Sequence, residues 1–284
     1  MGFRYDFAST GMVCSHSLDD QPKADDFFMH AHEMMEIFCF LSGSAKYNVE
    51  GNSYPLEPYT ILIMRMSETH MIQLDPTQPY ERMSIHFVPQ LISKVDQQET
   101  LLRPFNARAI GRLNKYDETC FSGKHYRSCI NAILSQIDSE KAQSVLIFSH
   151  LLSLLAEISD AFDRRPDKAD ENLQNGIAVE IVDYVNRNLF SDLSLQSISH
   201  RFYLSCSQVN RIYKKATGSS LWDYIVLKRL MSARQMILGG TPSTKACTEC
   251  GFHDYSAFYR AYKRQFQLAP KADRLLYEKN NNRI

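Results

Sequence analysis

LSCSQVNRIYKKATG, residues 204–218, has the same pattern as HDYSAFYRAYKRQFQ, residues 253–267. Arg211-Ile-Tyr-Lys-Lys in the first stretch aligns with Arg260-Ala-Tyr-Lys-Arg in the second, at an offset of 49 residues. Both stretches lie in a part of the chain whose apolar residues recur at helical spacing. An internal repeat of this length in a helical region predicts two copies of one supersecondary unit.

Helix start and stop signals divide the first copy into two helices. Ser194 is a good N-cap for a short helix, which residues 202–204 interrupt. Ser205 then caps a second helix, and Gly218 ends it. A short helix, a tight turn and a second helix with basic residues on one face form the plan of a helix-turn-helix unit.

The second copy carries the same signals. Gly251 lies at the turn, and Asp254 caps the helix that follows. Between the two copies, residues 221–238 have the pattern of one long amphipathic helix that would pack against both units. The sequence therefore predicts an all-α region with two helix-turn-helix units joined by a linker helix.

Charge is distributed unevenly along the chain, although the totals cancel. Residues 176–284 contain 16 Lys and Arg against 8 Asp and Glu, whereas residues 1–175 contain 16 against 24. A basic C-terminal third on an acidic body points to an anionic partner at that end.

The second helix of each unit carries the side chains suited to DNA. Asn and Gln can bond an adenine edge and Arg can bond guanine, while Lys contacts phosphates. For any one of these residues, the alternative is a contact to the DNA backbone alone. The DNA-binding candidates are Ser205, Ser207, Gln208, Asn210, Arg211, Lys214 and Lys215 in the first unit, and Tyr255, Ser256, Tyr259, Arg260 and Lys263 in the second. Tyr213 and Tyr262 fall on the inner face and are expected in the core.

With these residues in view, the C-terminal region resembles the DNA-binding domain of the arabinose-operon regulator (AraC/XylS) family. The resemblance covers roughly residues 176–275 and rests on RIYKKATGSSLWDYIVLKRLMSARQMIL (211–238) and GFHDYSAFYRAYKRQFQLAPKADR (251–274). It implies two helix-turn-helix units that bind promoter DNA.

Residues 27–90 have the alternation and turn signals of short strands, which predicts an all-β barrel or sandwich. FMHAHEMMEIFCFLSG (28–43), the stretch 47–72 and YERMSIHF (80–87) are similar to the cupin-type ligand-binding domain of these regulators. Residues 30, 32 and 36 share parity with 38 and 40, so on an extended chain they face one side.

This part of the chain offers a ligand set with two interpretations. We expect an effector pocket lined by His30, His32, Glu36, Phe38, Phe40, Tyr47 and His70. The alternative is a divalent transition metal, because His30, His32, Glu36 and His70 also resemble the metal residues of enzymatic cupins. His86 and Arg65 are further polar candidates whose facing the sequence does not decide.

Two amphipathic helices are expected at about residues 122–135 and 141–162. Their apolar stripes favour a dimer interface, and the alternative is packing against the protein's own barrel. The expected multidomain chain has a cupin-like barrel (1–115), a helical dimerisation segment (116–165), a flexible linker (166–175) and a DNA-binding domain (176–284).

The resemblance implies a sequence-specific transcription regulator, most often an activator, controlled by a small-molecule effector such as a sugar or related metabolite. Its implied partners are double-stranded promoter DNA, RNA polymerase and a second copy of the chain. Seven scattered cysteines agree with a reducing cytoplasm, and no stretch approaches twenty uninterrupted apolar residues, so no membrane is expected. No enzymatic activity or resident cofactor is expected. The alternatives are a metal- or redox-sensing regulator and a metal-dependent cupin enzyme with a DNA-binding tail.

Overall fold

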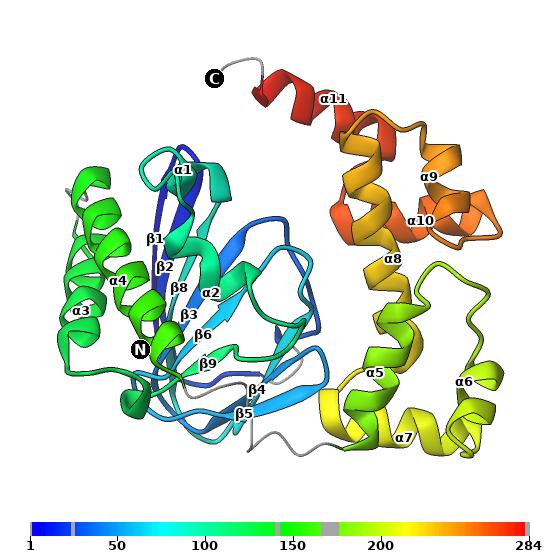
Figure 1. Ribbon diagram of the computed structural model, residues 1–284, viewed down its shortest axis with the longest axis horizontal. Coiled ribbons are helices and arrows are strands. Elements are labelled where there is room, and N and C mark those ends of the chain that lie inside the picture. The colour runs from blue at the N-terminus through cyan, green and yellow to red at the C-terminus, as the bar shows by residue number, and fades with distance from the viewer. Residues whose placement is uncertain (1, 24–25, 140–142, 166–175, 282–284) are drawn as a thin grey trace. The chain divides into compact units, whose positions relative to one another are not determined.

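The computed structural model describes residues 2–23, 26–139, 143–165 and 176–281, and the predicted linker at 166–175 lies outside these ranges. The chain divides into two compact units. The first comprises Met1–Phe28 and His32–Gln174, and the second comprises Met29–Ala31 and Asn175–Ile284. A sheet-rich first unit and a helical second unit confirm the predicted fold class (Figure 1).

The strands of the first unit form two antiparallel sheets. The larger sheet has the strand order β1-β2-β8-β3-β6-β9, and the smaller has the order β5-β4-β7. The sequence pattern predicted strands from residue 27 onward, and the structure adds β1 and β2 before them. The strands are β1 (Phe3–Ser9), β2 (Met12–Asp19), β3 (Met35–Ser42), β4 (Ala45–Val49), β5 (Asn52–Pro55), β6 (Ile61–Met64), β7 (His70–Leu74), β8 (Tyr80–Phe87) and β9 (Lys115–Tyr116).

Alternation along β3 sends its side chains into two different cores. Ile37 and Cys39 belong to the core that the larger sheet shares with its helical cover. Phe38 and Phe40 belong to the core that also contains Tyr47 of the smaller sheet. The interior of the barrel is therefore lined by the even-numbered residues of β3, as the parity argument predicted.

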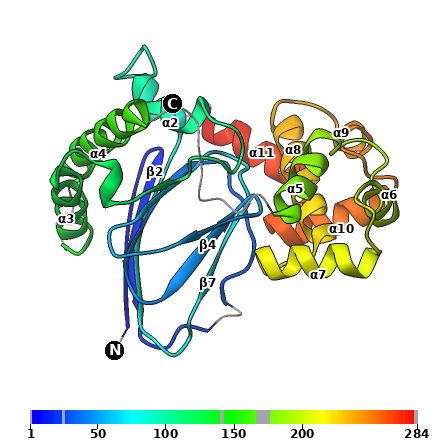
Figure 2. The same ribbon diagram turned by 60° about the horizontal axis from the view of Figure 1, so that its bottom comes forward.

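Helices cover the outer face of the larger sheet (Figure 2). The long helices α3 (His125–Ile137) and α4 (Ser144–Arg164) pack against each other and against the sheet. Shorter elements complete the unit: α1 (Pro89–Ser93), η2 (Thr100–Leu102), α2 (Arg103–Asn106) and η3 (Glu118–Cys120). The apolar stripes of α3 and α4 thus bury themselves on the protein's own barrel, which is the alternative that the sequence left open.

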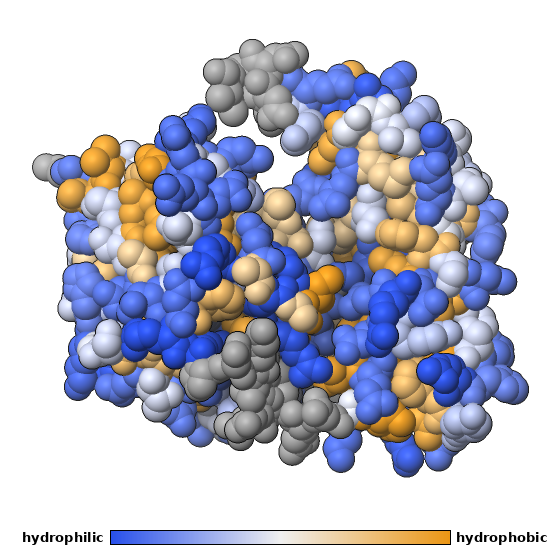
Figure 3. Space-filling model, viewed as in Figure 1, coloured by the Kyte–Doolittle hydropathy of each residue, from blue (hydrophilic) through white to orange (hydrophobic). Residues whose placement is uncertain are grey.

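By length and composition alone, α4 could cross a membrane. Its apolar stripe instead contributes Leu151, Leu154, Leu155 and Ile158 to the core of the first unit. One such helix is weak evidence for a membrane span, since a core helix passes the same test. Val145, near the start of α4, is 75 % exposed, and hydrophobic residues gather on the surface over this helix (Figure 3).

The second unit consists of two helix-turn-helix pairs that share a long helix. The first pair is α6 (Leu195–Arg201) and α7 (Cys206–Thr217), and the second is α9 (Ser243–Glu249) and α10 (Tyr255–Phe266). The helix α8 (Leu221–Leu238) joins them. Flanking helices are α5 (Ile177–Arg187) and α11 (Pro270–Asn281). The predicted linker helix has the bounds of α8.

Local capping explains where these helices begin and end. The Ser194 and Ser205 side chains each accept a hydrogen bond from the backbone N–H three residues later, as N-caps do. The Asp254 carboxylate accepts from the backbone N–H groups of Ser256 and Ala257. Gly218 ends α7 with a φ of +79°, a conformation that favours glycine. The capping residues predicted from the sequence are confirmed.

Candidate functional site

Three histidines surround a buried carboxylate in the first unit. The Glu36 Oε2 atom lies 2.9 Å from His32 Nε2 and 3.2 Å from His70 Nε2, and Glu36 Oε1 lies 3.7 Å from His86 Nε2. Glu36 on β3 and His86 on β8 are register partners across the sheet, and His70 begins β7. The cluster therefore joins the two sheets of the barrel.

Backbone carbonyls orient two of the imidazole rings. The Nδ1 atom of His32 lies 2.8 Å from the Met34 carbonyl oxygen, and Nδ1 of His70 lies 2.8 Å from the Glu68 carbonyl oxygen. A carbonyl can only accept a hydrogen bond, so Nδ1 donates in both rings. The Nε2 atoms of these two rings face the Glu36 carboxylate, which can only accept, so a ring protonated at both nitrogens donates to Glu36 through Nε2–H. A ring that loses this proton has an Nε2 lone pair that can bind a metal.

Burial and neighbouring charge compete at this site. Burial by itself raises the pKa of the Glu36 carboxyl, but His86, His32 and His70 together hold that pKa well below its usual range. Burial lowers the pKa of His86. At His70 burial also acts to lower the pKa, yet the hydrogen bond and charge of Glu36 raise it. Glu36 is thus an anion that attracts a cation or a hydrogen-bond donor.

The donor set can hold a metal ion. One ligand atom each from His32, Glu36 and His86 lie within 4.8 Å of one another. His70 Nε2 adds a fourth donor at the same carboxylate. Ligand atoms bound to one zinc ion at about 2.0–2.2 Å would lie roughly 3 to 3.5 Å apart, close to the 2.9 and 3.2 Å that separate Glu36 Oε2 from His32 Nε2 and His70 Nε2. Two or three imidazoles with one carboxylate suit zinc, iron, manganese or nickel.

The cluster contains one histidine that the sequence left undecided. His86 lies with His32, Glu36 and His70, whereas His30 is not in the group of ligand atoms around Glu36, and its role in a ligand set stays a prediction. The parity argument applies to neither His30 nor His32, because β3 starts only at Met35; His32 reaches Glu36 from the segment before the strand.

Two of the aromatic residues predicted to line an effector pocket, Tyr47 and Phe38, lie beside the cluster. The Tyr47 ring stacks on His70 with centroids 6.0 Å apart, and it also contacts Phe38 at 4.7 Å. Phe38, Phe40 and Tyr47 are all buried. Their role in binding an effector stays a prediction.

A second buried ion pair supports this part of the barrel. The Glu68 carboxylate accepts two hydrogen bonds from the Arg108 guanidinium, at 2.7 and 2.6 Å, and one each from Gly111 N and Asn114 Nδ2. Because the Glu68 carbonyl also accepts from His70, this pair fixes the backbone that orients a cluster histidine. No pattern in the sequence indicated this pair, since Glu68 and Arg108 are distant in the chain.

The helix α7 presents a basic face in the second unit. Ser207, Arg211, Lys214 and Lys215 are exposed, as predicted. Two of the DNA-binding candidates, Ser205 and Gln208, cap α7. The Gln208 Oε1 atom accepts a hydrogen bond from Ser205 N, and the two residues form a capping box. Asn210 departs from the prediction: it is half-buried, and its side-chain oxygen is buried without a hydrogen-bond partner among the described residues.

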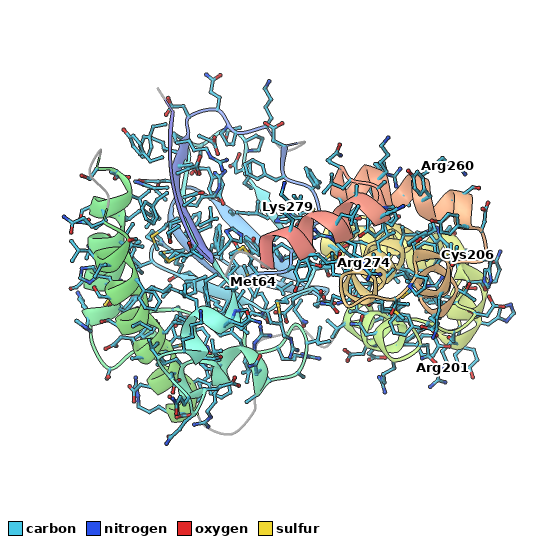
Figure 4. All side chains as sticks on the ribbon, turned by 90° about the horizontal axis from the view of Figure 1, so that it is seen from above. Met64, Arg201, Cys206, Arg260, Arg274 and Lys279 are labelled. Carbon is cyan, nitrogen blue, oxygen red and sulfur yellow. The ribbon has the colours of Figure 1, made fainter. Side chains whose placement is uncertain are left out.

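The helix α10 presents the equivalent face of the second pair. Tyr255, Ser256, Tyr259, Arg260 and Lys263 are all exposed. Arg260 lies on the outer side of the helix (Figure 4). Tyr213 and Tyr262, predicted as core residues, are 1 % and 0 % exposed.

The basic side chains of both faces are available to an external anion. Within the ranges that the structure describes, no acidic side chain forms an ion pair with them. They are Arg211, Lys214, Lys215, Arg260 and Lys263. Unpaired cations on two equivalent, capped helices suit contacts with phosphates and base edges of DNA.

Family models match parts of both units. Residues 18–158 match the family model described as an AraC-like ligand binding domain, and residues 198–275 match a helix-turn-helix domain. The HTH-type transcriptional activator RhaS of Shigella flexneri serotype 5b is 21 % identical over 91 % of this chain and 92 % of its own length. The thermoregulatory protein LcrF of Yersinia pestis is 20 % identical over 86 % of this chain and 90 % of its own.

A solved structure of apo ToxT from Vibrio cholerae is similar over 93 % of this chain and 96 % of its own, with 13 % identity and a TM-score of 0.42. The histidine cluster lies inside the ligand-binding match, and α7 and α10 lie inside the helix-turn-helix match. This chain belongs to the AraC family of transcription regulators.

Proposed function

We propose that the chain binds promoter DNA sequence-specifically through α7 and α10, and activates transcription under the control of a small molecule bound in the barrel. The observation that carries the proposal is the pair of capped helices whose exposed Arg and Lys side chains have no acidic partner among the described residues. A group left charged and unpaired on a rigid helix is ready for an anionic partner. RhaS, a relative at low identity, is an activator.

Single substitutions on the two helices test the DNA-binding part. Arg211→Ala and Arg260→Ala should each cost about 1–3 kcal/mol of binding to a specific site and relax discrimination at one base position. Sites come from selection on a randomised double-stranded DNA pool with the full chain. If both variants select and bind the same sites as the unaltered protein, α7 and α10 do not read the bases.

The barrel is proposed to take a hydroxylated metabolite such as a sugar. The Glu36 carboxylate and the Nε2 atoms of His32 and His86 can bond hydroxyl groups, and the neighbouring Tyr47 ring can pack against a sugar face. A thermal-shift screen with a panel of monosaccharides tests this. A rise in melting temperature that a sugar produces, that Glu36→Gln abolishes and that His30→Ala retains would support a sugar-binding pocket in the barrel. If no sugar changes the melting temperature, the proposed pocket is contradicted.

Control of DNA binding follows from a population shift. A ligand that binds one arrangement of the two units better favours that arrangement, and the DNA affinity changes by the same coupling free energy.

We propose that a second copy docks on the exposed side of α4, near Val145, and that RNA polymerase is contacted in the cytoplasm. Sedimentation of Val145→Glu against the unaltered chain tests the dimer.

A metal-sensing regulator is the second candidate, and the histidine cluster favours it. His32, Glu36, His70 and His86 would hold the ion, with Met34 and Glu68 carbonyls orienting two of the rings. A bound metal would supply a Lewis acid or a redox centre that an effector could meet. A metal-dependent enzyme is disfavoured, because both matched models describe the domains of a regulator.

Elemental analysis of full-length protein, purified without chelator or a histidine tag, tests the second candidate. We expect a stoichiometric first-row metal that His86→Ala removes and His30→Ala retains, since His86, unlike His30, belongs to the group of ligand atoms around Glu36. Protein without metal, or equal loss in the two variants, would rule out this ligand set and leave the organic effector.

A further inference from the structure

Each helix-turn-helix pair has its own core, built on its own part of α8. Tyr224 and Ile225, in the first half of α8, belong to the core of α5, α6 and α7. Ala233 and Ile237, in the second half, belong to the core of α9 and α10. The position of one pair relative to the other thus depends on α8 and on whatever ties the two pairs together at its middle.

Arg229 lies at that middle and is only 4 % exposed. Its guanidinium donates three hydrogen bonds to backbone carbonyls: Nε to Leu189 at 2.8 Å, Nη2 to Ser191 at 2.9 Å and Nη1 to Gly251 at 2.7 Å. Leu189 and Ser191 lie between α5 and α6 of the first pair, whereas Gly251 lies in the turn of the second pair. One rigid side chain therefore holds the backbone of both pairs.

The geometry around Gly251 shows how close this contact is. A Cβ atom at residue 251 would lie 2.9 Å from the Arg229 Cζ atom, nearer than carbon atoms approach without a shift. Gly251 also has a φ of +80°, which L side chains rarely adopt. The turn of the second pair is thus built so that its backbone can touch the guanidinium.

Arg234, five residues further along α8, offers a matched contrast. Its guanidinium binds the Asp273 carboxylate of α11 through Nε and Nη2, at 2.6 and 2.9 Å. Its Cζ atom lies 4.7 Å from the Phe266 ring centroid of α10. Among the described residues these contacts of Arg234 lie on α10 and α11, whereas those of Arg229 reach both pairs. A planar guanidinium with five donors can serve several carbonyls at once, which a lysine ammonium at the same position cannot reproduce.

We propose that Arg229 is a positioning residue that fixes the offset between α7 and α10, and so sets the spacing of the two DNA blocks that one chain recognises. The inference rests on the proposed DNA-binding function. Two reading helices of one chain would enter successive major-groove segments, about 34 Å or one helical turn apart. Arg229 touches no DNA in this scheme and acts through the two backbones that it joins.

Selection from a randomised double-stranded DNA pool reports the spacing directly, and it counts only protein that folds and binds. The full chain should select two conserved blocks at one fixed separation. Arg229→Lys should select the same two blocks with separations spread over neighbouring base-pair spacings. Gly251→Ala, which approaches the contact from its other end, should broaden the spacing too, and Arg234→Lys should keep the original spacing.

Affinity provides the second readout. For the selected duplex, Arg229→Lys should bind roughly ten-fold more weakly, because part of the about 10²- to 10⁴-fold gain from linking two binding modules depends on their geometry. For a duplex in which one block is scrambled, Arg229→Lys and the unaltered protein should bind with equal affinity.

Three outcomes would overturn the proposal. The first is a fixed block spacing in Arg229→Lys, and the second is an equal broadening of the spacing in Arg234→Lys. The third is the loss of both blocks in Arg229→Lys, which would assign Arg229 to folding alone. If the unaltered chain selects no conserved block, the DNA-binding function itself fails, which is a different result.

Discussion

Replacing Glu68 with glutamine should strongly destabilise the first unit. The carboxylate is almost fully buried with Arg108, and its two oxygens accept from Arg108, Gly111 N, Asn114 Nδ2 and Arg65 N. A glutamine amide would turn one acceptor into a donor, so in either orientation an N–H would face other N–H groups. Breaking a buried pair by removing one charge costs about 3–5 kcal/mol.

The expected change in melting temperature follows from the size of the unit. A domain of 150–250 residues shifts by about 2–4 °C for each kcal/mol, so the first unit should melt about 6–20 °C lower. Asp160→Asn is the control, because Asp160 pairs with Arg164 on the exposed side of α4, where removing the pair should cost no more than about 0.5 kcal/mol.

The assay can follow the two units separately. Trp222, the single tryptophan of the chain, lies on α8, so its fluorescence reports the second unit. Circular dichroism reports both units. Glu68→Gln should move the dichroism transition of the first unit in urea and leave the Trp222 transition within about 0.5 kcal/mol of the original. A loss below about 1 kcal/mol, or an equal shift of the Trp222 curve, would refute the reasoning.

Three further predictions concern the second unit. Asp254→Ala removes the cap of α10 and should cost about 1 kcal/mol of stability, measured by urea unfolding, and weaken binding to the second DNA block. Lys214→Ala should weaken specific and nonspecific DNA binding alike and reduce the salt slope by about one, and a loss confined to the specific site would contradict a phosphate contact. Burial acts to raise the pKa of Asp273, but the hydrogen bonds from Arg234 and Tyr262 leave that pKa lowered. The ionised carboxylate therefore stabilises the folded protein at pH values above the unfolded pKa of about 3.9, and this stabilisation is lost as the pH falls through the lower folded pKa. Asp273→Asn should therefore be less stable at pH 7 and lose less on acidification by Trp222 fluorescence; parallel pH curves would contradict this.

The helical unit was predictable because its signals are local. Ser205, Asp254 and Gly218 act within one helical turn of themselves, so a reader of the sequence can place the helix ends. The repeat at Arg211 and Arg260 then shows that the unit occurs twice. What the sequence could not show is the contact of Arg229 with both pairs, because it joins carbonyls 38 and 40 residues before it and 22 residues after it.

The barrel was predictable as a class but not strand by strand. The strands β1 and β2 were not anticipated, and β2 is held by pairing with β8, from Met12↔Phe87 to Asp19↔Tyr80. Such long-range pairing leaves no pattern within either segment, since register is set by the partner strand.

The presence of His86 in the buried cluster shows why site residues are harder to predict than folds. In β8, Met83, Ile85 and Phe87 pack beneath the helices, so the opposite, polar side of the strand, with His86, faces the barrel interior. A reader who assumes that the apolar side of a strand points into its barrel assigns His86 to the outside. In β8 the assumption fails because helices cover the outer face of the sheet. The apolar side of β8 packs against these helices, so its polar side, with His86, faces the barrel interior and Glu36. Which face is inside is therefore decided by α3 and α4, about 40 to 80 residues further along the chain, and not by the alternation of the strand itself.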